Sequence, residues 1–339
     1  MRPSNRFTRT LRLVTAAATL GALLAVPLAT AASAASPTVA LGFIPAGVAV
    51  NPSTNTVYVA NYFGNKVSVI NGANNTVTST VSVGTNPDGV AVNPSTNTVY
   101  VTDTDGNSVS VINGSTNTVT STISVGGNPV GVAVNPSTNT VYVANYFDNS
   151  VSVINGSTNT VTSTVSVGTN PDGVAVNPST NTVYVANTNG NKVSVINGAN
   201  NTVTSTILGG NPDAVAVNPS TNTIYVANQG DTSVSVIAPP VPPVLSRVMP
   251  GDQLLVPHWS GVAAAQGKMA YYTATAYDRS GNVAGTCQTM SGSGRSCRIT
   301  GLSGHVTYQV TVTATAWIGT VTSAPSNQVA GVPLAPHTR

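Results

Sequence analysis

The 339-residue sequence predicts an all-β protein of two domains, and three observations carry that prediction. A unit of 42 residues recurs almost unchanged through much of the chain. Charged residues make up only 6% of the sequence and glutamate is absent, which excludes long helices stabilised by ion pairs. A proline-rich stretch at 238–243 then separates the repeats from a segment of different composition. We therefore expect a repeat domain, a stiff linker and a second β domain.

The first 35 residues have the features of a secretory signal peptide. Several arginines precede an apolar run from Leu13 to Leu28, and the small residues at 32–34 fit the pattern that signal peptidase cleaves. A membrane anchor is the alternative, but the run is short for a bilayer core of roughly 30 Å, and Pro27 interrupts it. We expect removal of residues 1–35, a secreted or cell-surface protein, and no membrane span in the mature chain.

The net charge of +3 is misleading, because 4 of the 12 basic residues lie in the signal peptide. The mature chain has 8 basic against 9 acidic residues, a net charge of −1. The repeat domain at 36–237 carries −5, whereas residues 244–339 carry +4. This balance argues against nucleic acid as a partner and supports two separate domains.

The repeat has the pattern of four short strands. The segment GVAVNPSTNTVYV begins at Gly47, Gly89, Gly131 and Gly173, each 42 residues after the last, and AVAVNPSTNTIYV begins at Ala214. A full copy contains the runs GVAV, TVYVAN, VSVIN and TVTSTVSV, separated by turn residues such as Asn, Pro and Gly. Four short strands per repeat are typical of a propeller blade. The sequence therefore predicts a β-propeller of five blades over 36–237.

The fifth copy lacks its fourth strand before the linker begins. An orphan strand, Thr38–Phe43, precedes the first copy and aligns with the missing strand. We therefore expect five four-stranded blades closed by this N-terminal strand, which would remove two exposed sheet edges. An open arc and a ring completed by a second chain are the alternatives.

The repeats resemble those of the YVTN β-propeller family. The motif that names the family is Tyr100-Val101-Thr102-Asp103 here, and in the other copies alanine replaces the threonine. The resemblance covers about 200 residues and implies the propeller fold. Members of the family often close with seven blades, whereas this chain shows five copies, and they do not share one function.

Chain direction predicts which loops share a face of the propeller. Loops between the second and third strands lie with the inter-blade segments on one face, called the rim here. The rim carries all seven propeller aspartates and both Tyr-Phe pairs, whereas the opposite face repeats NPSTN and NGxxN. Ordinary hairpin turns are the alternative interpretation of these loops. The candidate ligand-binding residues are Tyr62, Phe63, Asp88, Asp103, Asp105, Tyr146, Phe147, Asp148, Asp172, Asp213 and Asp231.

Aromatic rings beside Asn and Asp side chains suit a carbohydrate, because a ring stacks on a sugar face while amides and carboxylates meet hydroxyls. An extracellular protein is the alternative partner. The stretch Asp103–Asn107 resembles the start of a calcium loop, but the later bidentate carboxylate is absent. We therefore predict neither a metal nor a cofactor.

The propeller segment contains no His, Cys, Glu or Arg, so it cannot assemble Ser-His-Asp, Cys-His or histidine-metal sites. We therefore expect a non-catalytic binding or scaffold protein. Two alternatives remain: a hydrolase or lyase that acts on polysaccharides through rim aspartates, and a structural component of a surface layer.

Residues 244–333 resemble a fibronectin type III domain, followed by a tail at 334–339. Trp259 matches the buried tryptophan of that family, and Leu302 with Tyr308 matches its tyrosine corner. We interpret His258 and His305 as surface or edge residues without ligand partners. Cys287 and Cys297 are the only cysteines, and in an exported protein they predict one disulfide.

Overall fold

The computed structural model describes residues 38–208, 210–238, 243–251, 253–260, 269–289, 294–304, 306–316, 319–322 and 329–330. The predicted signal peptide, most of the linker, His305 and the tail lie outside the described residues. No helix within those ranges is long and apolar enough to cross a membrane.

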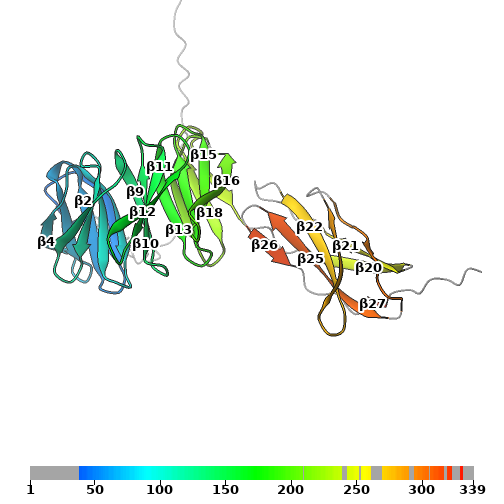
Figure 1. The fold of residues 1–339 in the computed structure, drawn as a ribbon. Helices are drawn as coiled ribbons and strands as arrows, with labels where there is room; N and C mark the ends of the chain where they lie inside the picture. Colours follow the sequence, from blue (N-terminus) through cyan, green and yellow to red (C-terminus); the bar gives the residue numbers. More distant parts are fainter. Residues whose placement is uncertain are drawn as a thin grey trace, which may run out of the picture. The chain divides into compact units, whose positions relative to one another are not determined.

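Five antiparallel sheets follow one another along the chain (Figure 1). The first contains β1 (Pro45–Asn51), β2 (Thr56–Asn61), β3 (Lys66–Asn71) and β4 (Thr76–Ser82). The second contains β5 (Pro87–Asn93), β6 (Thr98–Asp103), β7 (Ser108–Asn113) and β8 (Thr118–Ser124). The third contains β9 (Pro129–Asn135), β10 (Thr140–Asn145), β11 (Ser150–Asn155) and β12 (Thr160–Ser166). The fourth contains β13 (Pro171–Asn177), β14 (Thr182–Asn187), β15 (Lys192–Asn197) and β16 (Thr202–Leu208), and the fifth contains β17 (Pro212–Asn218), β18 (Thr223–Asn228) and β19 (Ser233–Ile237).

Asparagine forms the turns and joins the blades. Asn55, Asn65 and Asn75 have φ of 50°, 50° and 57°, a left-handed conformation that asparagine tolerates, and the same positions recur in later blades. On the face opposite the rim, the Asn51 side-chain amide donates to Oδ1 of Asn97 in the next blade at 2.8 Å. The same bond links each later pair of neighbours. One residue type thus shapes the hairpins and ties the sheets together.

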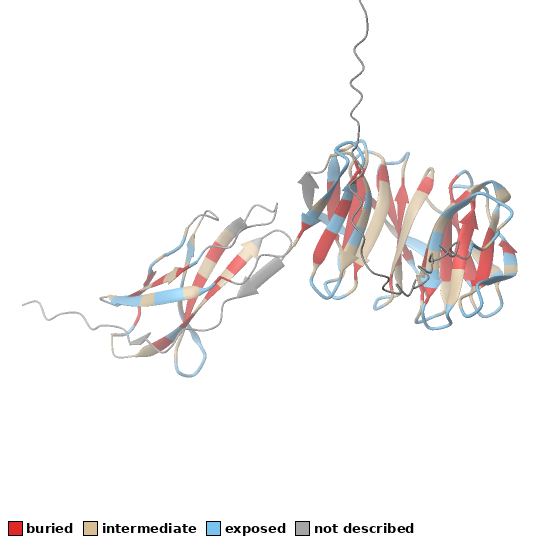
Figure 2. Ribbon diagram, turned by 180° about the vertical axis from the view of Figure 1, so that it is seen from behind, coloured by how far each residue is buried: buried red, intermediate tan, exposed pale blue. Residues whose placement is uncertain are grey.

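Burial between neighbouring blades supplies the core. Tyr58, Val67 and Val69 of the first blade form one cluster with Val99 and Val101 of the second. Equivalent clusters fill the next three junctions, and the second and third strands of the inner blades are buried along most of their length, while most loops are exposed or half-buried (Figure 2). Burying one such side chain stabilises by roughly 1.5–3 kcal/mol, so contacts between blades dominate the stability of this part.

Glycine in the innermost strand lets successive blades approach closely. A Cβ at Gly47, Gly89 or Gly131 would clash with a backbone carbonyl oxygen of the next blade. Because the same close contact recurs at each junction, it fixes a similar angle between each pair of neighbouring blades.

The predicted closure of the ring by an N-terminal strand is wrong. Thr38–Phe43 does not form a strand, and β17–β19 remain a three-stranded sheet. Innermost strands contact in the order β1, β5, β9, β13 and β17, but β17 makes no comparable contact with β1. One physical difference at the last blade is Ala214, which stands where the inner blades have the glycine that makes the close contact with the next blade. Ile44 instead stays on its own blade, where its carbonyl accepts the Tyr62 N–H at 2.9 Å.

Two apolar sheet faces are exposed as a result. The first end face, on β1, includes Val48 and Val50, which are 63% and 54% exposed. The last end face, on β18 and β19, includes Tyr225, Val234 and Val236, which are 42%, 60% and 44% exposed. Equivalent residues in the inner junctions are covered by a neighbouring blade.

The C-terminal part consists of two antiparallel sheets around an apolar core. One sheet contains β20 (Leu245–Gly251), β21 (Leu254–Trp259) and β24 (Ile299–Thr300). The other contains β22 (Met269–Tyr277), β23 (Val283–Thr289), β25 (Thr307–Ala316), β26 (Gly319–Thr322) and β27 (Val329–Ala330).

The core of this part contains the three residues that the sequence singled out. Trp259, Leu302 and Tyr308 are each 3% exposed, and the Ser303 N–H donates to the Tyr308 hydroxyl at 2.9 Å. The predicted disulfide between Cys287 and Cys297 is confirmed.

Candidate functional site

The rim loops are attached to the inter-blade segments by a repeated hydrogen bond. Asn65, in the loop after β2, accepts the N–H of Asn86 through its Oδ1 at 2.9 Å. The same bond recurs at 2.8–3.0 Å in the next three blades. The rim is therefore a firm scaffold, and the predicted grouping of these loops on one face is confirmed by the contacts.

Two aromatic pairs project from this scaffold. Tyr62 and Phe63 lie in a short 3-10 turn, η1 (Tyr62–Gly64), with ring centroids 5.0 Å apart and planes at 89°. Tyr146 and Phe147 pack similarly in the third blade, at 5.7 Å and 70°. Phe63 and Phe147 are 70% and 68% exposed. Each tyrosine thus packs against a phenylalanine that offers an apolar ring to solvent.

Carboxylates of the second blade lie near the first aromatic pair. Asp105 is exposed and accepts the side-chain amide of Asn86 at 2.6 Å, which holds it at the junction of the first two blades. Burial raises the pKa of Tyr62, and the charges of Asp105 and Asp88 raise that pKa further. The hydroxyl of Tyr62 therefore interacts electrostatically with both carboxylates.

A carboxylate also accompanies the second aromatic pair. Asp148 directly follows Phe147, is exposed, and accepts the Gly127 N–H through Oδ2 at 2.7 Å. The Tyr146 carbonyl accepts the side-chain amide of Asn170 at 3.1 Å, which ties this loop to the fourth blade. Each aromatic pair thus has amides and a carboxylate in its loop region, supplied by the second blade for the first pair and by Asp148 of the same loop for the second pair.

Three aspartates lie on innermost strands, on β5, β13 and β17. Burial raises the pKa of Asp172 to about 6, and the charges of Asp213 and Asp88 contribute to that rise. Burial also raises the pKa of Asp88. Burial and, to a smaller extent, the repulsion between these carboxylates therefore favour the protonated form of Asp172 below about pH 6.

Asp103 does not face the rim surface, although the sequence placed it there. Its side chain is fully buried and accepts the hydroxyls of Ser108 and Ser110 at 3.1 and 2.8 Å. In the third blade Asn145 occupies the same position and donates to two serines. Asp103 therefore belongs to the blade interior. Asp231, by contrast, is exposed in the loop between β18 and β19.

The structure adds two residues that the sequence reasoning missed. Phe43 is 44% exposed, and the Lys66 ammonium lies 5.6 Å from its ring centroid. A Cβ at Gly64 would touch this ring, so Phe43 lies beside the first aromatic pair. The sequence did contain a sign of this role, because a phenylalanine at position 43 stands where the later copies have Thr85, Gly127 and Thr169.

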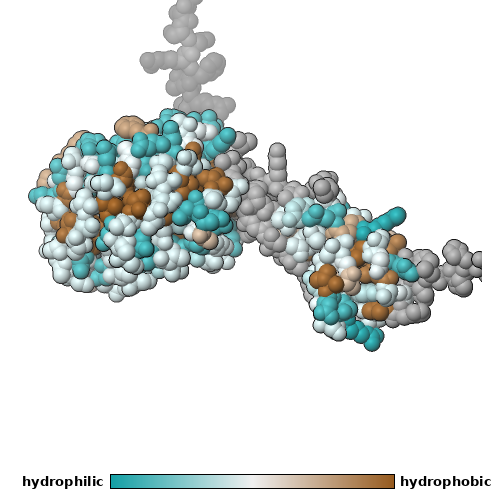
Figure 3. All heavy atoms as spheres, in the orientation of Figure 1, coloured by the Kyte–Doolittle hydropathy of each residue, from teal (hydrophilic) through white to brown (hydrophobic). Residues whose placement is uncertain are grey.

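The described part of the rim offers exposed aromatic rings, amides and carboxylates. Within the described ranges, no group of three His, Cys, Asp or Glu side chains is placed to hold a metal ion. The visible propeller surface is mostly neutral to hydrophilic, with separate apolar patches (Figure 3).

Comparisons with known proteins agree with the fold. A family model described as "Lactonase, 7-bladed beta-propeller" matches residues 71–167. Among solved structures, the hydrazine synthase of Kuenenia stuttgartiensis is similar, with a TM-score of 0.50 and 18% sequence identity over 63% of this chain and 73% of that chain. No curated protein matches the sequence. The repeated four-stranded sheets and the family match together define the class, which is that of the β-propeller proteins.

Proposed function

We propose that this chain is a secreted or cell-surface binding protein whose rim holds a glycan. The observation that carries the proposal is the first aromatic pair. This pair consists of the largely exposed Phe63 and of Tyr62, whose pKa is raised by burial and by the charges of Asp105 and Asp88. Rings of this kind stack on the apolar face of a sugar, and fixed carboxylates and amides accept or donate to its hydroxyls. The same combination in the third blade provides a second contact for a chain of sugar units.

Other parts of the molecule fit the same role. We assign the repeats to the YVTN type and the C-terminal sandwich to the fibronectin type III type, with residues 1–35 as the signal, 36–237 as the propeller domain and 244–333 as the sandwich. The disulfide between Cys287 and Cys297 is stable in an oxidising compartment outside the cytoplasm. The sandwich then serves as a spacer that keeps the rim accessible.

A glycan array and a polysaccharide pull-down with the full mature chain test the proposal. We expect binding that is lost in Phe63→Ala/Phe147→Ala, because both substitutions remove exposed rings without opening the core. Val283→Ala is the matched control, since this exposed valine lies in the C-terminal sandwich. Absence of binding to every glycan, or equal loss in the control, would overturn the glycan proposal and direct the search to protein partners.

A hydrolase is the second candidate. The family match carries a lactonase name, and Asp172 has the raised pKa expected of a general acid near neutral pH. Turnover of a lactone or polysaccharide that Asp172→Asn abolishes, and Asp231→Asn does not, would establish this alternative. Binding without turnover supports the non-catalytic proposal.

A further inference from the structure

The two end faces match the surfaces that the inner junctions bury. At the first junction, Tyr58 and Val69 of one blade cover Val90 and Val92 of the next. Tyr225 and Val236 are the corresponding residues of the last end face, and Val48 and Val50 are those of the first end face. Each exposed face is therefore one half of an interface that the chain already makes.

At each end face, one side chain of the asparagine row lacks the inter-blade hydrogen bond that its equivalents in the inner blades form, among the described residues. In the inner blades the amide of an asparagine such as Asn177 donates to the next blade, to Asn222 at 2.8 Å. Asn218 is the corresponding donor of the last blade, and its amide donates to no described residue. Asn55 is the corresponding acceptor of the first blade, and its Oδ1 accepts from no described residue. The donor and acceptor lie at opposite ends of one chain.

The incomplete fifth sheet also corresponds to a segment that precedes the first blade. The residues at 38–42, TVALG, align with TVSVG at 80–84, which ends the fourth strand and leads into the next blade. Among the described residues no strand pairs with the outer edge of β19, whereas its equivalents β3, β7, β11 and β15 each pair with a fourth strand.

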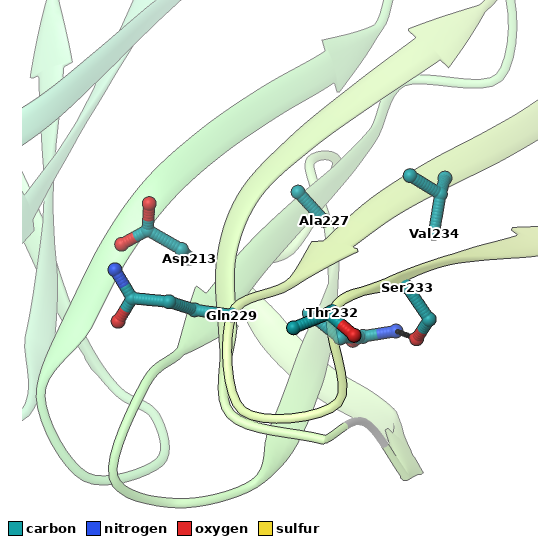
Figure 4. A pocket seen from close by; sticks show the side chains of 7 residues that line it. Asp213, Ala227, Gln229, Thr232, Ser233 and Val234 are labelled. Atoms are coloured by element: carbon teal, nitrogen blue, oxygen red, sulfur yellow. Dashed lines mark hydrogen bonds between the residues drawn. The ribbon is translucent and has the colours of Figure 1, made fainter. Parts of the chain in front are cut away.

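A pocket of ≈ 370 Å³ lies on the side of the fifth blade that no described blade covers. Asp213 and Gln229 lie beside each other at its edge, and Val234 and Ala227 extend from the strands behind it (Figure 4). The equivalents of Ala227 and Val234 in the fourth blade are Ala186 and Val193, which are 0% and 1% exposed beneath the next blade.

From these observations we propose that a second copy of this chain occupies the last end face. The first end face of that copy packs on Tyr225, Val234 and Val236, its residues 38–41 pair with the open edge of β19, and its Asn55 accepts from Asn218. The contact is head-to-tail, because different faces meet. A contact of this type leaves one face free at each end, so it builds open chains or larger rings.

Two substitutions in the last blade make this contact weaker than the junctions inside the chain. Ala214 stands where the inner blades have Gly47, Gly89 or Gly131, and its Cβ points to the place where a neighbouring carbonyl would lie. Thr232 has φ of 48° at the position of Asn191 and lacks an amide side chain. The association is therefore reversible and depends on concentration.

Sedimentation velocity with pairs of face variants tests the head-to-tail contact. Val48→Asp blocks the first end face and Val236→Asp blocks the last, and both residues are exposed in a single copy, so each variant folds. We expect the wild-type chain to associate as its concentration rises, and each variant alone to remain a monomer. A mixture of the two variants should form dimers and nothing larger, because only one compatible pair of faces remains. Monomers in the mixture, or a wild-type chain that stays monomeric, would refute the proposal.

Restoring the repeat residues provides the opposite test. Ala214→Gly/Thr232→Asn should strengthen wild-type association roughly tenfold, because the overpacked contact is relieved. Ala40→Pro should weaken it, because proline removes an N–H from the pairing segment. Unchanged association in the first variant would contradict the inter-blade geometry, and unchanged association in the second would contradict pairing by residues 38–41.

Discussion

The fourth and fifth blades contain almost the same sequence but have different environments. In the fourth blade Tyr184 is 4% exposed and Val193 is 1% exposed, because the fifth blade covers them. In the fifth blade the equivalent Tyr225 and Val234 are 42% and 60% exposed. The difference shows that the repeat supplies half of each core and that its neighbour supplies the other half. Stability therefore depends on the number of junctions more than on the number of blades.

The largest effect should come from removing a ring in an inner junction. We expect Tyr142→Ala to cost about 3–5 kcal/mol, because this ring is fully buried between the third and fourth blades. Tyr225→Ala, in the same motif of the last blade, should cost less than half as much. Chemical denaturation of both variants measures the difference, and equal losses would contradict the assignment of the core to the junctions.

The second-largest loss of stability should come from replacing a glycine of an innermost strand. Gly131→Ala places a Cβ against the carbonyl oxygen of Asp172, and we expect a loss of about 1–3 kcal/mol from overpacking. The chain already tolerates alanine at 214, where no blade follows. Ala214→Gly is the control, and in dilute solution it should lower the unfolding free energy by only about 0.5–1 kcal/mol, the entropic cost of glycine in a strand. A harmless Gly131→Ala would show that the inner strands have more space than the structure gives them.

The pH dependence of stability should follow Asp172. Its pKa is about 6 in the folded chain, against 3.8 for an unperturbed aspartate, so the folded state favours the protonated form. Stability is then highest below pH 3.8 for this group and is lost as the pH rises through 6. Asp172→Asn should remove that loss and stabilise the chain at pH 7, on the order of 1 kcal/mol after screening by solvent. Thermal melts between pH 4 and 8 compare it with Asp231→Asn, and parallel curves for wild type and Asp172→Asn would rule out this role.

The smallest effect should come from the asparagine bonds between blades. Asn135 donates to Asn181 of the next blade at 2.8 Å, and Asn135→Ala should cost about 1 kcal/mol. Asn218→Ala removes the corresponding amide at the end of the row and should cost less. Differential scanning calorimetry of the two variants measures both losses of stability. A larger loss for Asn218→Ala than for Asn135→Ala would mean that the asparagine hydrogen bonds between blades do not stabilise the junctions.

Much of the local structure could be predicted from the sequence. The strand runs, the left-handed asparagine turns and the shared face of the rim loops all follow from spacing and residue type. Ring closure could not be predicted from the count of strands, because it depends on the angle between blades. The change from glycine to Ala214 in the last copy was a visible signal that the fifth blade differs from the others.

The candidate site was only partly predictable. Both aromatic pairs and Asp105 lie on the rim as expected, because loop residues between strands point to solvent. Asp103 is buried because it ends β6 at a position where the side chain turns into the blade toward Ser110. Phe43 was missed because it was interpreted as part of a closing strand, whereas the structure places it against Gly64.

The glycine contact at each inner junction also determines how the number of 42-residue repeats can change. Duplication or loss of one 42-residue unit within the row restores an identical junction on both sides, since each unit has the same donor and acceptor surfaces. Only the unit that contains Ala214 is marked as terminal. An insertion before it would extend the rim by one further loop without redesign of the core, so the length of the rim can vary while the packing between blades stays the same.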